Sequence, residues 1–438
     1  MNCNAIDSLY LKANGELPCW CSPGESFPIL RLDAAALAGW DIVRDVLDGP
    51  AFRTMRRELY HGRMPFPYCA GCSFLRDDGE AAWGRIDTQS FRLRAVDTVQ
   101  VESSFLCNVD CPLCVRLDVR KQVKTPPYQL APELFRKVVD DLVAAGIGVR
   151  EFWFSGRGEP LLNPGFALMA RYARDRLGSR VTCHTNGNLR FDARLLEAGL
   201  DEIEIAFDGV DQESYARYRR GGRLEVVERF ARDFAAARRA AGRTSPELVW
   251  KMILFEWNSS DAELERAVAR AHELGLDRVL LVDTDTPGGI SYRDGGKRRR
   301  ELDPLVARLA QRHADLKVEL LGYHSVYSLM PEVEVRLRLD AEPGRRVVLG
   351  RLFNHLLESR RVRVTCDLES GSGQPAHRLV DQTVELAERT ELVDSFAVST
   401  DALPADDYRV HIAVSDPTTG RLLSEGSADF AVGAVELE

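Results

Sequence analysis

The residues best suited to chemistry in this sequence are its cysteines. Three of the ten, Cys107, Cys111 and Cys114, fall within one stretch of eight residues. Three thiolates on one loop can hold three irons of a [4Fe–4S] cluster and leave the fourth iron open to another ligand. A structural zinc site usually has four ligands and paired cysteine spacing. The spacing therefore favours an iron–sulfur cluster whose open iron can bind a substrate or cofactor.

A second group of cysteines precedes this loop: Cys3, Cys19, Cys21, Cys69 and Cys72. The segment 9–21 predicts a hairpin that turns at Asn14-Gly15 and presents two of these thiols, and the Cys-Ala-Gly-Cys segment at 69–72 presents two more. Four or more thiols can enclose a zinc ion or an iron–sulfur cluster, and spacing alone leaves both open. Five cysteines suffice for one cluster but not for two, and Cys19 competes with Cys21 for a place in it.

Length and composition exclude several classes of protein. The chain has 438 residues, of which 45% are hydrophobic and 29% charged, as in ordinary globular proteins. A net charge of −9 argues against a generally basic nucleic-acid binder, and no run of 18 apolar residues predicts a membrane span. The first residues lack the basic stretch and apolar block of a secretory signal. We therefore expect a cytoplasmic protein, in which clustered thiols bind metal or do redox chemistry.

The middle of the chain, about residues 93–325, must position the three-cysteine loop. Strand signals at 98–105, 149–156, 180–187, 201–209, 247–256 and 277–284 alternate with helix signals at 132–146, 165–178, 192–200, 212–241 and 261–275. Six βα units in succession predict an α/β fold with a parallel sheet, open or curled into a partial (β/α)6 barrel. The cysteine loop directly follows the first strand, and active sites of such barrels gather at the carboxyl ends of the strands.

The flanking segments differ from this middle block. Residues 1–92 contain five cysteines and many turn formers, which predicts a small cysteine-rich module. Residues 326–438 contain short runs of alternating apolar and polar residues, which predict an antiparallel β-sandwich. Cys366 lies in one of these runs and is expected in the core of the sandwich. Three domains are therefore expected, over residues 1–92, 93–325 and 326–438.

The C-x3-C-x2-C loop after a strand that opens a βα array resembles the radical S-adenosylmethionine (SAM) superfamily. The resemblance covers about residues 95–285. It implies that Cys107, Cys111 and Cys114 hold a [4Fe–4S] cluster whose open iron binds SAM. One electron from a flavodoxin- or ferredoxin-like partner then cleaves SAM, and the 5′-deoxyadenosyl radical abstracts hydrogen from a small-molecule substrate.

Other residues are similar to the family's SAM-binding positions. The segment after the second strand looks like its Gly-Gly-Glu-Pro motif, with an arginine in place of one glycine: Ser155, Gly156, Arg157, Gly158 and Glu159. The resemblance implies that the carboxylate of this motif meets the SAM amino group. It also suggests cofactor contacts for Leu113, which would pack near adenine, and for Asn186, Asp208 and Lys251. A solvated, outward-facing side chain is the alternative for Lys251.

The N-terminal cysteines look like the SPASM or twitch module, which carries auxiliary [4Fe–4S] clusters in many radical SAM enzymes. The family usually places this module after the barrel, whereas here it precedes the barrel. We expect one auxiliary cluster with Cys69 and Cys72 among its ligands. Separately, Cys183 on the third strand could donate a hydrogen atom to a substrate radical if it points inward, as a cysteine does in radical SAM epimerases. A buried structural cysteine is the alternative.

The substrate is the least determined part of this interpretation. The C-terminal segment weakly resembles the β-sandwich tail of polysaccharide-export ATPases, which binds glycan ends. A carbohydrate-type substrate that undergoes epimerisation, oxidation or dehydration is therefore the first hypothesis, with sugars, aminoglycosides and nucleotide sugars as candidates. A maturase that modifies a ribosomal peptide or protein side chain is the alternative. A non-enzymatic zinc protein is a third interpretation.

Overall fold

The computed structural model describes most of the chain and divides it into two compact units. Described are residues 3–18, 28–32, 35–63, 65, 80–112, 114, 127–283, 299–322, 333–342, 345–354, 360–371, 377–386, 391–399, 403–404, 406–420 and 422–432. One unit comprises residues 1–284 and 292–326, and the other comprises 285–291 and 327–438. The N-terminal segment and the α/β sheet therefore belong to the same compact unit.

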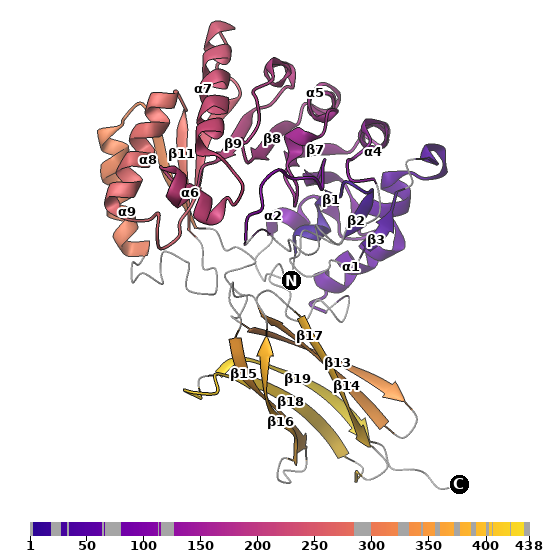
Figure 1. Ribbon diagram of the computed structural model, residues 1–438. Helices are drawn as coiled ribbons and strands as arrows, with labels where there is room; N and C mark the ends of the chain where they lie inside the picture. Colours follow the sequence, from indigo (N-terminus) through magenta and orange to yellow (C-terminus); the bar gives the residue numbers. More distant parts are fainter. Residues whose placement is uncertain are drawn as a thin grey trace. The chain divides into compact units, whose positions relative to one another are not determined.

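The first unit is built on a parallel sheet of eight strands in the order β1-β6-β7-β8-β9-β10-β11-β12 (Figure 1). Every neighbouring pair in it is parallel. The strands are β1 (Leu9–Leu11), β6 (Ala95–Val101), β7 (Gly148–Phe154), β8 (Arg180–Thr185), β9 (Glu202–Ala206), β10 (Glu247–Ile253), β11 (Arg278–Asp283) and β12 (Lys317–Gly322). The six strands expected from the sequence are β6 to β11, which confirms the α/β class, and β1 and β12 extend the sheet at its two edges.

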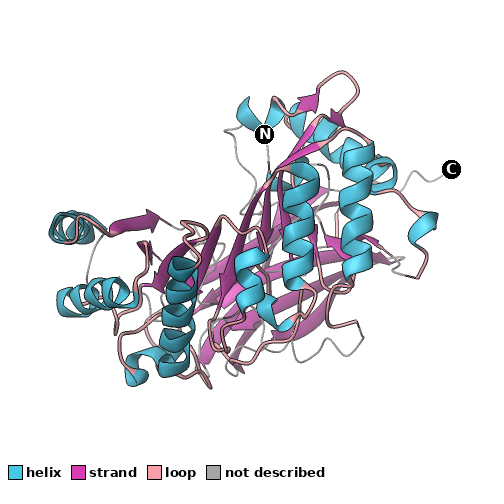
Figure 2. Ribbon diagram, turned by 90° about the horizontal axis from the view of Figure 1, so that it is seen from above, coloured by secondary structure: helices cyan, strands magenta, loops and turns pink. Residues whose placement is uncertain are grey.

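The crossovers between these strands place their helices on one face of the sheet, as right-handed βαβ connections require (Figures 1 and 2). The helices are α4 (Pro132–Ala144), α5 (Phe166–Leu177), α6 (Gln212–Tyr218), α7 (Leu224–Ala240), α8 (Asp261–Leu274) and α9 (Arg299–Arg312), with short 3₁₀ turns η5 (Pro160–Leu162) and η6 (Ala193–Glu197). The helix signal at 212–241 is divided near Gly221-Gly222 into α6 and α7. The helix expected at 192–200 is the short turn η6.

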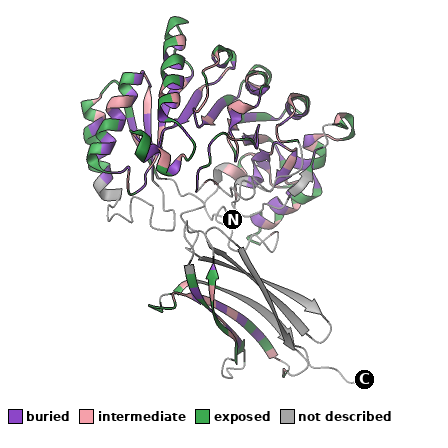
Figure 3. Ribbon diagram, viewed as in Figure 1, coloured by how far each residue is buried: buried purple, intermediate pink, exposed green. Residues whose placement is uncertain are grey.

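The core of this unit lies between the sheet and the helices (Figure 3). Side chains of a strand alternate between its two faces, so one set from each strand packs against the helices: Val99, Phe152, Val181, Ile203, Trp250 and Val279. The alternate set lies on the opposite face, away from these helices, which we call the open face. On β8, β9 and β10 this set contains His184, Glu204 and Lys251.

The N-terminal segment differs from the expected hairpin over 9–21. β1 pairs with β6 in parallel, and β2 (Glu16–Pro18) pairs instead with β3 (Pro28–Arg31). All three residues of β1 are buried, so this strand suits a sheet covered on both sides better than a solvent-facing hairpin. The segment also contains η1 (Asn4–Ile6), η2 (Leu37–Gly39), η3 (Ile42–Leu47), α1 (Pro50–Tyr60), α2 (Glu80–Trp83), β4 (Ile86–Asp87) and β5 (Arg92–Leu93).

Arg56 on α1 holds this N-terminal segment together. Its side chain is fully buried and donates to the carbonyl oxygens of Ile6 and Leu47 at 2.6 Å and of Phe91 at 3.2 Å. Replacing Arg56 by methionine leaves three backbone acceptors without this donor, so we expect a loss of about 3–5 kcal/mol in the free energy of unfolding of the α/β unit. Urea denaturation followed by tryptophan fluorescence measures it. Arg57→Met is the control, because Arg57 is half exposed and its loss should cost under about 1 kcal/mol.

Asp7 gives this segment a pH dependence. Burial raises its pKa to about 6, although Arg85 lies 2.9 Å away and favours the charged form. The pKa of Asp7 in the folded protein exceeds the unfolded value of 3.8. The contribution of Asp7 to the free energy of unfolding is therefore complete below pH 4 and is lost as pH rises through 6. We expect wild type to lose up to about 3 kcal/mol between pH 4 and pH 7 relative to Asp7→Asn. Equal pH profiles for the two proteins would contradict this.

The second unit consists of two antiparallel sheets. One has the order β13-β14-β17 and the other β16-β15-β18-β19. The strands are β13 (Val333–Glu342), β14 (Arg345–Asn354), β15 (Arg360–Ser370), β16 (His377–Leu386), β17 (Glu391–Ser399), β18 (Asp406–Ser415) and β19 (Leu422–Val432). Cys366 is fully buried in its core, as expected. Within the described part of the chain, no helix has the length and apolar character needed to cross a membrane.

Candidate functional site

The three-cysteine loop leaves the carboxyl end of β6. Cys111 is buried and Cys107 and Cys114 are partly buried. Negative charge on Cys107 raises the pKa of the Cys111 thiol, and negative charge on Cys111 and Cys114 raises the pKa of Tyr218. The three thiols therefore lie near one another. Among the described residues, no three His, Cys, Asp or Glu side chains are grouped as ligands of a single metal ion. A cubane cluster differs from such a site because each thiolate binds its own iron.

Side-chain N–H groups are directed at two of the three sulfur atoms. Arg219 Nη1 lies 3.5 Å from the sulfur of Cys111, and Asn186 Nδ2 lies 3.6 Å from the sulfur of Cys107. The thiol of Cys114 lies 3.9 Å from the carbonyl oxygen of Arg157. Donors at these distances stabilise negative charge on sulfur. Cys107 and Cys111 therefore each have a donor suited to a thiolate, whereas the carbonyl oxygen beside Cys114 accepts from a thiol.

Arg219 is held in place by Asp208. Arg219 Nε donates to the Asp208 carboxylate at 2.5 Å, and the second oxygen of that carboxylate accepts from the Ile253 amide at 2.6 Å. Burial alone would lower the pKa of Arg219, but Asp208 and Cys111 outweigh it and hold that pKa well above its usual range. Burial also raises the pKa of Cys111, against the opposing charge of Arg219. Asp208 itself is fully buried, and Arg219 bridges it to Cys111.

The motif after β7 packs closely against the segment that leads into the cysteine loop. A Cβ on Gly156 would lie 2.4 Å from Glu102 Cγ, and a Cβ on Gly158 would lie 2.0 Å from the carbonyl oxygen of Ser104. The carboxylate of Glu102 accepts from the Arg157 amide at 2.6 Å and from the Tyr10 hydroxyl at 2.8 Å. Only glycine permits this approach at either position.

Glu159 ties this motif to the end of β8. Its two oxygens accept from the Thr185 hydroxyl at 2.7 Å, the Asn186 amide at 2.7 Å and the Leu161 amide at 3.1 Å. The side chain is buried, and burial raises its pKa against these hydrogen bonds. The carboxylate therefore positions Asn186, whose side chain reaches Cys107. Its expected contact with the SAM amino group remains a prediction.

The other expected site residues occupy different places. Ser155 lies just after β7, where its carbonyl oxygen accepts from Gln100 at 3.1 Å, and Arg157 is buried beside the cysteine loop. Lys251 lies on the open face and pairs with Glu204 at 2.6 Å, so it is not an isolated solvated side chain.

Cys183 requires a correction. A hydrogen donor to the substrate would have to point toward the open face of the sheet. Cys183 instead points toward the helices and is fully buried in the core between them and the sheet. The alternation along β8 puts it on the face opposite His184. Burial also raises the pKa of its thiol well above the usual value. The structure therefore favours the alternative of a structural cysteine.

Several expected residues lie outside the described part of the chain: Cys19, Cys21, Cys69, Cys72 and Leu113. Cys3 is described; it precedes η1 and packs against the core of the first unit. The auxiliary cluster thus remains a prediction. Sequence reasoning missed Arg219, Glu102 and Tyr10. The one available signal was a carboxylate directly after the first strand, at position 102.

Known proteins are similar to the part of the chain that contains this site. Residues 101–290 match the model of the Radical SAM superfamily. The chain is 32% identical over 139 residues to GTP 3′,8-cyclase of Chlorobaculum tepidum, a match that covers 31% of this chain and 40% of the relative. It is 25% identical to GTP 3′,8-cyclase of Pseudomonas fluorescens, a match that covers 70% of this chain and 93% of the relative. SuiB of Streptococcus suis bound to S-adenosylmethionine matches at 15% identity and a TM-score of 0.40, covering 62% of each chain.

Residues 101–290 form a radical SAM superfamily domain, and the chain is an enzyme. The first of these matches spans less than half of the relative's length. Members of the superfamily use a [4Fe–4S] cluster and SAM, and the comparisons confirm the family, the enzymatic class and these two cofactors as expected from the cysteine loop.

Proposed function

We propose that this enzyme binds its [4Fe–4S] cluster through Cys107, Cys111 and Cys114, cleaves SAM reductively there, and takes a hydrogen atom from the sugar ring of a nucleotide or nucleotide sugar. The observation that carries the proposal is the loop itself, with N–H donors directed at the sulfur atoms of Cys107 and Cys111. The chemistry supplied by the cluster and SAM, when bound, is one-electron cleavage to a carbon-centred radical.

The chain's own residues account for how the loop would be held. Gly156 and Gly158 allow the motif to pack against the segment 102–104, and Glu102 fixes the Arg157 amide. Glu159 orients Asn186 toward Cys107, and Asp208 orients Arg219 toward Cys111. These fixed donors lower the energy of negatively charged sulfur before any cofactor arrives, which is preorganisation of the kind that electrostatic catalysis uses.

The substrate class is supported by two independent arguments. The relatives in the comparison are named for a reaction of GTP, a nucleotide that contains ribose. The weak resemblance of the second unit to glycan-binding sandwiches points to sugars. A free polysaccharide is not favoured by the relatives' names, whereas a nucleotide or nucleotide sugar satisfies both arguments. A flavodoxin- or ferredoxin-type protein is the proposed electron donor, and one auxiliary cluster at the N-terminal cysteines is part of the proposal.

The proposal is tested by anaerobic incubation of reconstituted enzyme with SAM, dithionite and deuterated candidates. We expect 5′-deoxyadenosine to form, and deuterium to appear in it from ring-deuterated GTP or UDP-glucose. Deuterium transfer from a ribosomal precursor peptide, with a mass change in that peptide, would favour the maturase alternative. Absence of 5′-deoxyadenosine from a fully iron-loaded enzyme would overturn the proposal.

Arg219 provides a second test, which does not need the substrate. A hydrogen bond from a cation to a cluster-ligating sulfur stabilises the reduced cluster and raises its reduction potential. Removing it in Arg219→Met should lower the midpoint potential by roughly 50 mV, as expected for one charge-assisted hydrogen bond. A redox titration monitored by electron paramagnetic resonance measures this shift. Arg217→Met is the control, because Arg217 packs over Trp257 and not on a cysteine; an equal shift in both variants would contradict the role.

A further inference from the structure

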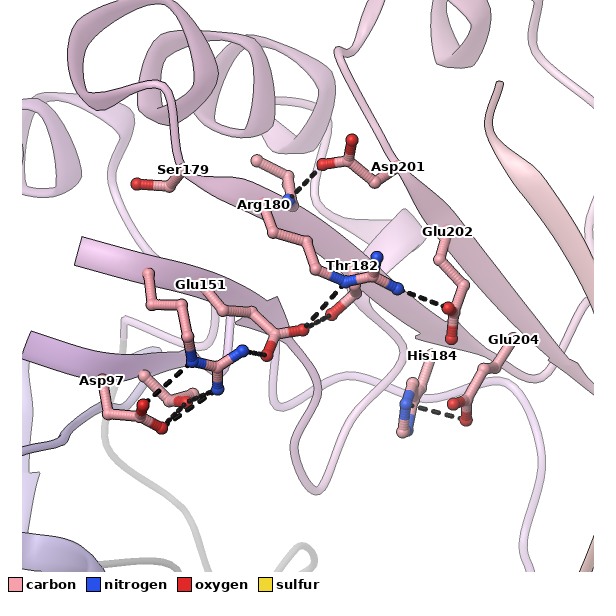
Figure 4. Close-up of polar contacts among 12 residues, drawn as sticks. Asp97, Glu151, Ser179, Arg180, Thr182, His184, Asp201, Glu202 and Glu204 are labelled. Atoms are coloured by element: carbon pink, nitrogen blue, oxygen red, sulfur yellow. Dashed lines mark hydrogen bonds and ion pairs between the residues drawn. The ribbon is translucent and has the colours of Figure 1, made fainter. Parts of the chain in front are cut away.

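Three neighbouring strands place a cluster of polar side chains on the open face of the sheet: His184 from β8, Glu204 from β9 and Lys251 from β10. We call it the His-Glu-Lys triad. His184 and Glu204 are direct partners in the strand register, and His184 Nε2 lies 2.8 Å from Glu204 Oε2 (Figure 4). Lys251 Nζ lies 2.6 Å from the same oxygen and 3.2 Å from His184 Nδ1.

The contacts assign charges within the triad. Since Lys251 can only donate, His184 Nδ1 accepts from it and His184 Nε2–H donates to Glu204. Burial lowers the pKa of His184, which agrees with a neutral ring. Burial alone would raise the pKa of Glu204, but His184 and Lys251 outweigh it and hold that pKa well below its usual range. The triad therefore consists of one cation, one anion and one neutral imidazole.

The triad retains hydrogen-bonding capacity. Two of the three N–H groups of Lys251 are used by His184 and Glu204, and Glu204 Oε1 has no partner among the described residues. Its side chains keep exposed fractions of 24% for His184, 11% for Glu204 and 16% for Lys251. Donors and an acceptor thus remain available to a ligand on this face.

The same strands carry a different network at their amino ends. There Arg278 contacts Glu202 at 2.8 Å, Glu319 at 3.0 Å and Glu247 at 3.2 Å, and Arg180 contacts Glu202 at 2.5 Å (Figure 4). Each cation in that network meets at least one carboxylate of a neighbouring strand, which ties the strands together. The His-Glu-Lys triad lies nearer the carboxyl ends, where the cysteine loop is.

The triad is linked to the candidate cluster site through the residues that follow it on β8 and β10. His184 is followed by Thr185, which contacts Glu159, and by Asn186, which contacts Cys107. Two residues after Lys251, the Ile253 amide donates to Asp208, the partner of Arg219. Substrates of α/β barrels bind at this end of the strands.

Apolar side chains lie beside the triad on the same face. Val249, the strand partner of Glu204, and Leu280, the strand partner of Lys251, form a small buried cluster with Val282. Trp153 meets His184 edge to face, with ring centroids 5.0 Å apart. A few convergent polar groups next to apolar surface are typical of sites for small molecules.

We propose that the His-Glu-Lys triad binds the hydroxyl-bearing ring of the substrate, with Glu204 accepting from one hydroxyl group and Lys251 donating to another. The inference rests on the proposed function and extends it by naming the residues that hold the ring. Hydroxyl groups both donate and accept, so they suit an adjacent carboxylate and ammonium. Phosphate groups do not, because Glu204 opposes their charge. The phosphates therefore lie away from the triad.

The test compares Lys251→Met and Glu204→Gln with Thr182→Val in the reconstituted holoenzyme. Thr182 lies on the same face of β8, toward the amino end, and contacts Glu151 at 3.0 Å. Equilibrium dialysis with SAM present measures binding of GTP and UDP-glucose. We expect wild type and Thr182→Val to bind at least one probe alike, and both triad variants to bind it about tenfold or more weakly.

A second readout separates binding from a structural role. Formation of 5′-deoxyadenosine without substrate should stay within about twofold of wild type in Glu204→Gln and Thr182→Val, since neither residue touches the cysteines or is among the expected SAM contacts. Equal probe affinity in wild type and the triad variants, or no binding of either probe to wild type, would overturn the inference. A parallel loss of binding and of substrate-free 5′-deoxyadenosine would show a structural role and would also overturn it. Failure of wild type to make 5′-deoxyadenosine would instead contradict the proposed function.

Discussion

Cys111→Ala is expected to abolish formation of 5′-deoxyadenosine, with a fall of roughly 100-fold or more, and to lower the iron content of the anaerobically reconstituted enzyme. Loss of a residue outside a metal's ligand set already costs about 10–100-fold, and Cys111 is proposed as a ligand. Its sulfur atom also lies 3.5 Å from Nη1 of Arg219.

Cys183→Ala is the matched control for this prediction. Cys183 is also buried, but it packs in the core between the sheet and the helices. We expect full iron content, and 5′-deoxyadenosine formation within about twofold of wild type, because a core cysteine usually behaves as a small hydrophobic residue. Loss of iron in Cys183→Ala, or retention of wild-type activity in Cys111→Ala, would contradict the assignment of the ligands.

Gly158→Ala is expected to impair SAM cleavage almost as strongly, without removing any thiol. A Cβ at this position would lie 2.0 Å from the carbonyl oxygen of Ser104, so backbone must move. Overpacking of this kind costs about 1–3 kcal/mol in stability, and displacement of a reacting group by about 1 Å costs on the order of 100-fold in rate. The displaced segments are the motif and the start of the cysteine loop. The rate of 5′-deoxyadenosine formation at saturating SAM measures the effect.

Gly148→Ala is the control for the motif glycine. Gly148 opens β7, and a Cβ on it would meet nothing within 4 Å. We expect wild-type stability and activity for this variant. If Gly158→Ala behaved like Gly148→Ala, the close approach between the motif and the segment before the cysteine loop would have no functional role.

The fold and the cysteine loop were predictable because their signals are local and repeated. Each strand from β6 to β11 has its own apolar pattern, and three cysteines within eight residues by themselves indicate a loop that binds a metal or a cluster. The register of β1 was not predictable, since three apolar residues near a turn suit a hairpin as well as the edge of a parallel sheet. Only the partner strand β6 decides between them.

The residues that surround the cysteine loop were less predictable than the cysteines themselves. Arg219 lies more than a hundred residues from Cys111, and its role depends on how α6 packs rather than on any motif. The alternation of side chains along β8 implies that Cys183 and Thr185 share a side. It could not tell which side faces the helices, because β8 is buried on both faces. The same ambiguity hid the His-Glu-Lys triad, since single polar residues in buried strands give no pattern of their own.

The most direct test of the central claim is electron–nuclear double resonance of the reduced holoenzyme with SAM labelled by ¹⁵N at its amino group. If Cys107, Cys111 and Cys114 leave one iron without a protein ligand, the spectrum should show a ¹⁵N coupling from SAM bound directly to that iron. Coupling should be absent from Cys111→Ala and present in Cys183→Ala. A fully reduced, iron-replete wild-type enzyme without ¹⁵N coupling would contradict the account.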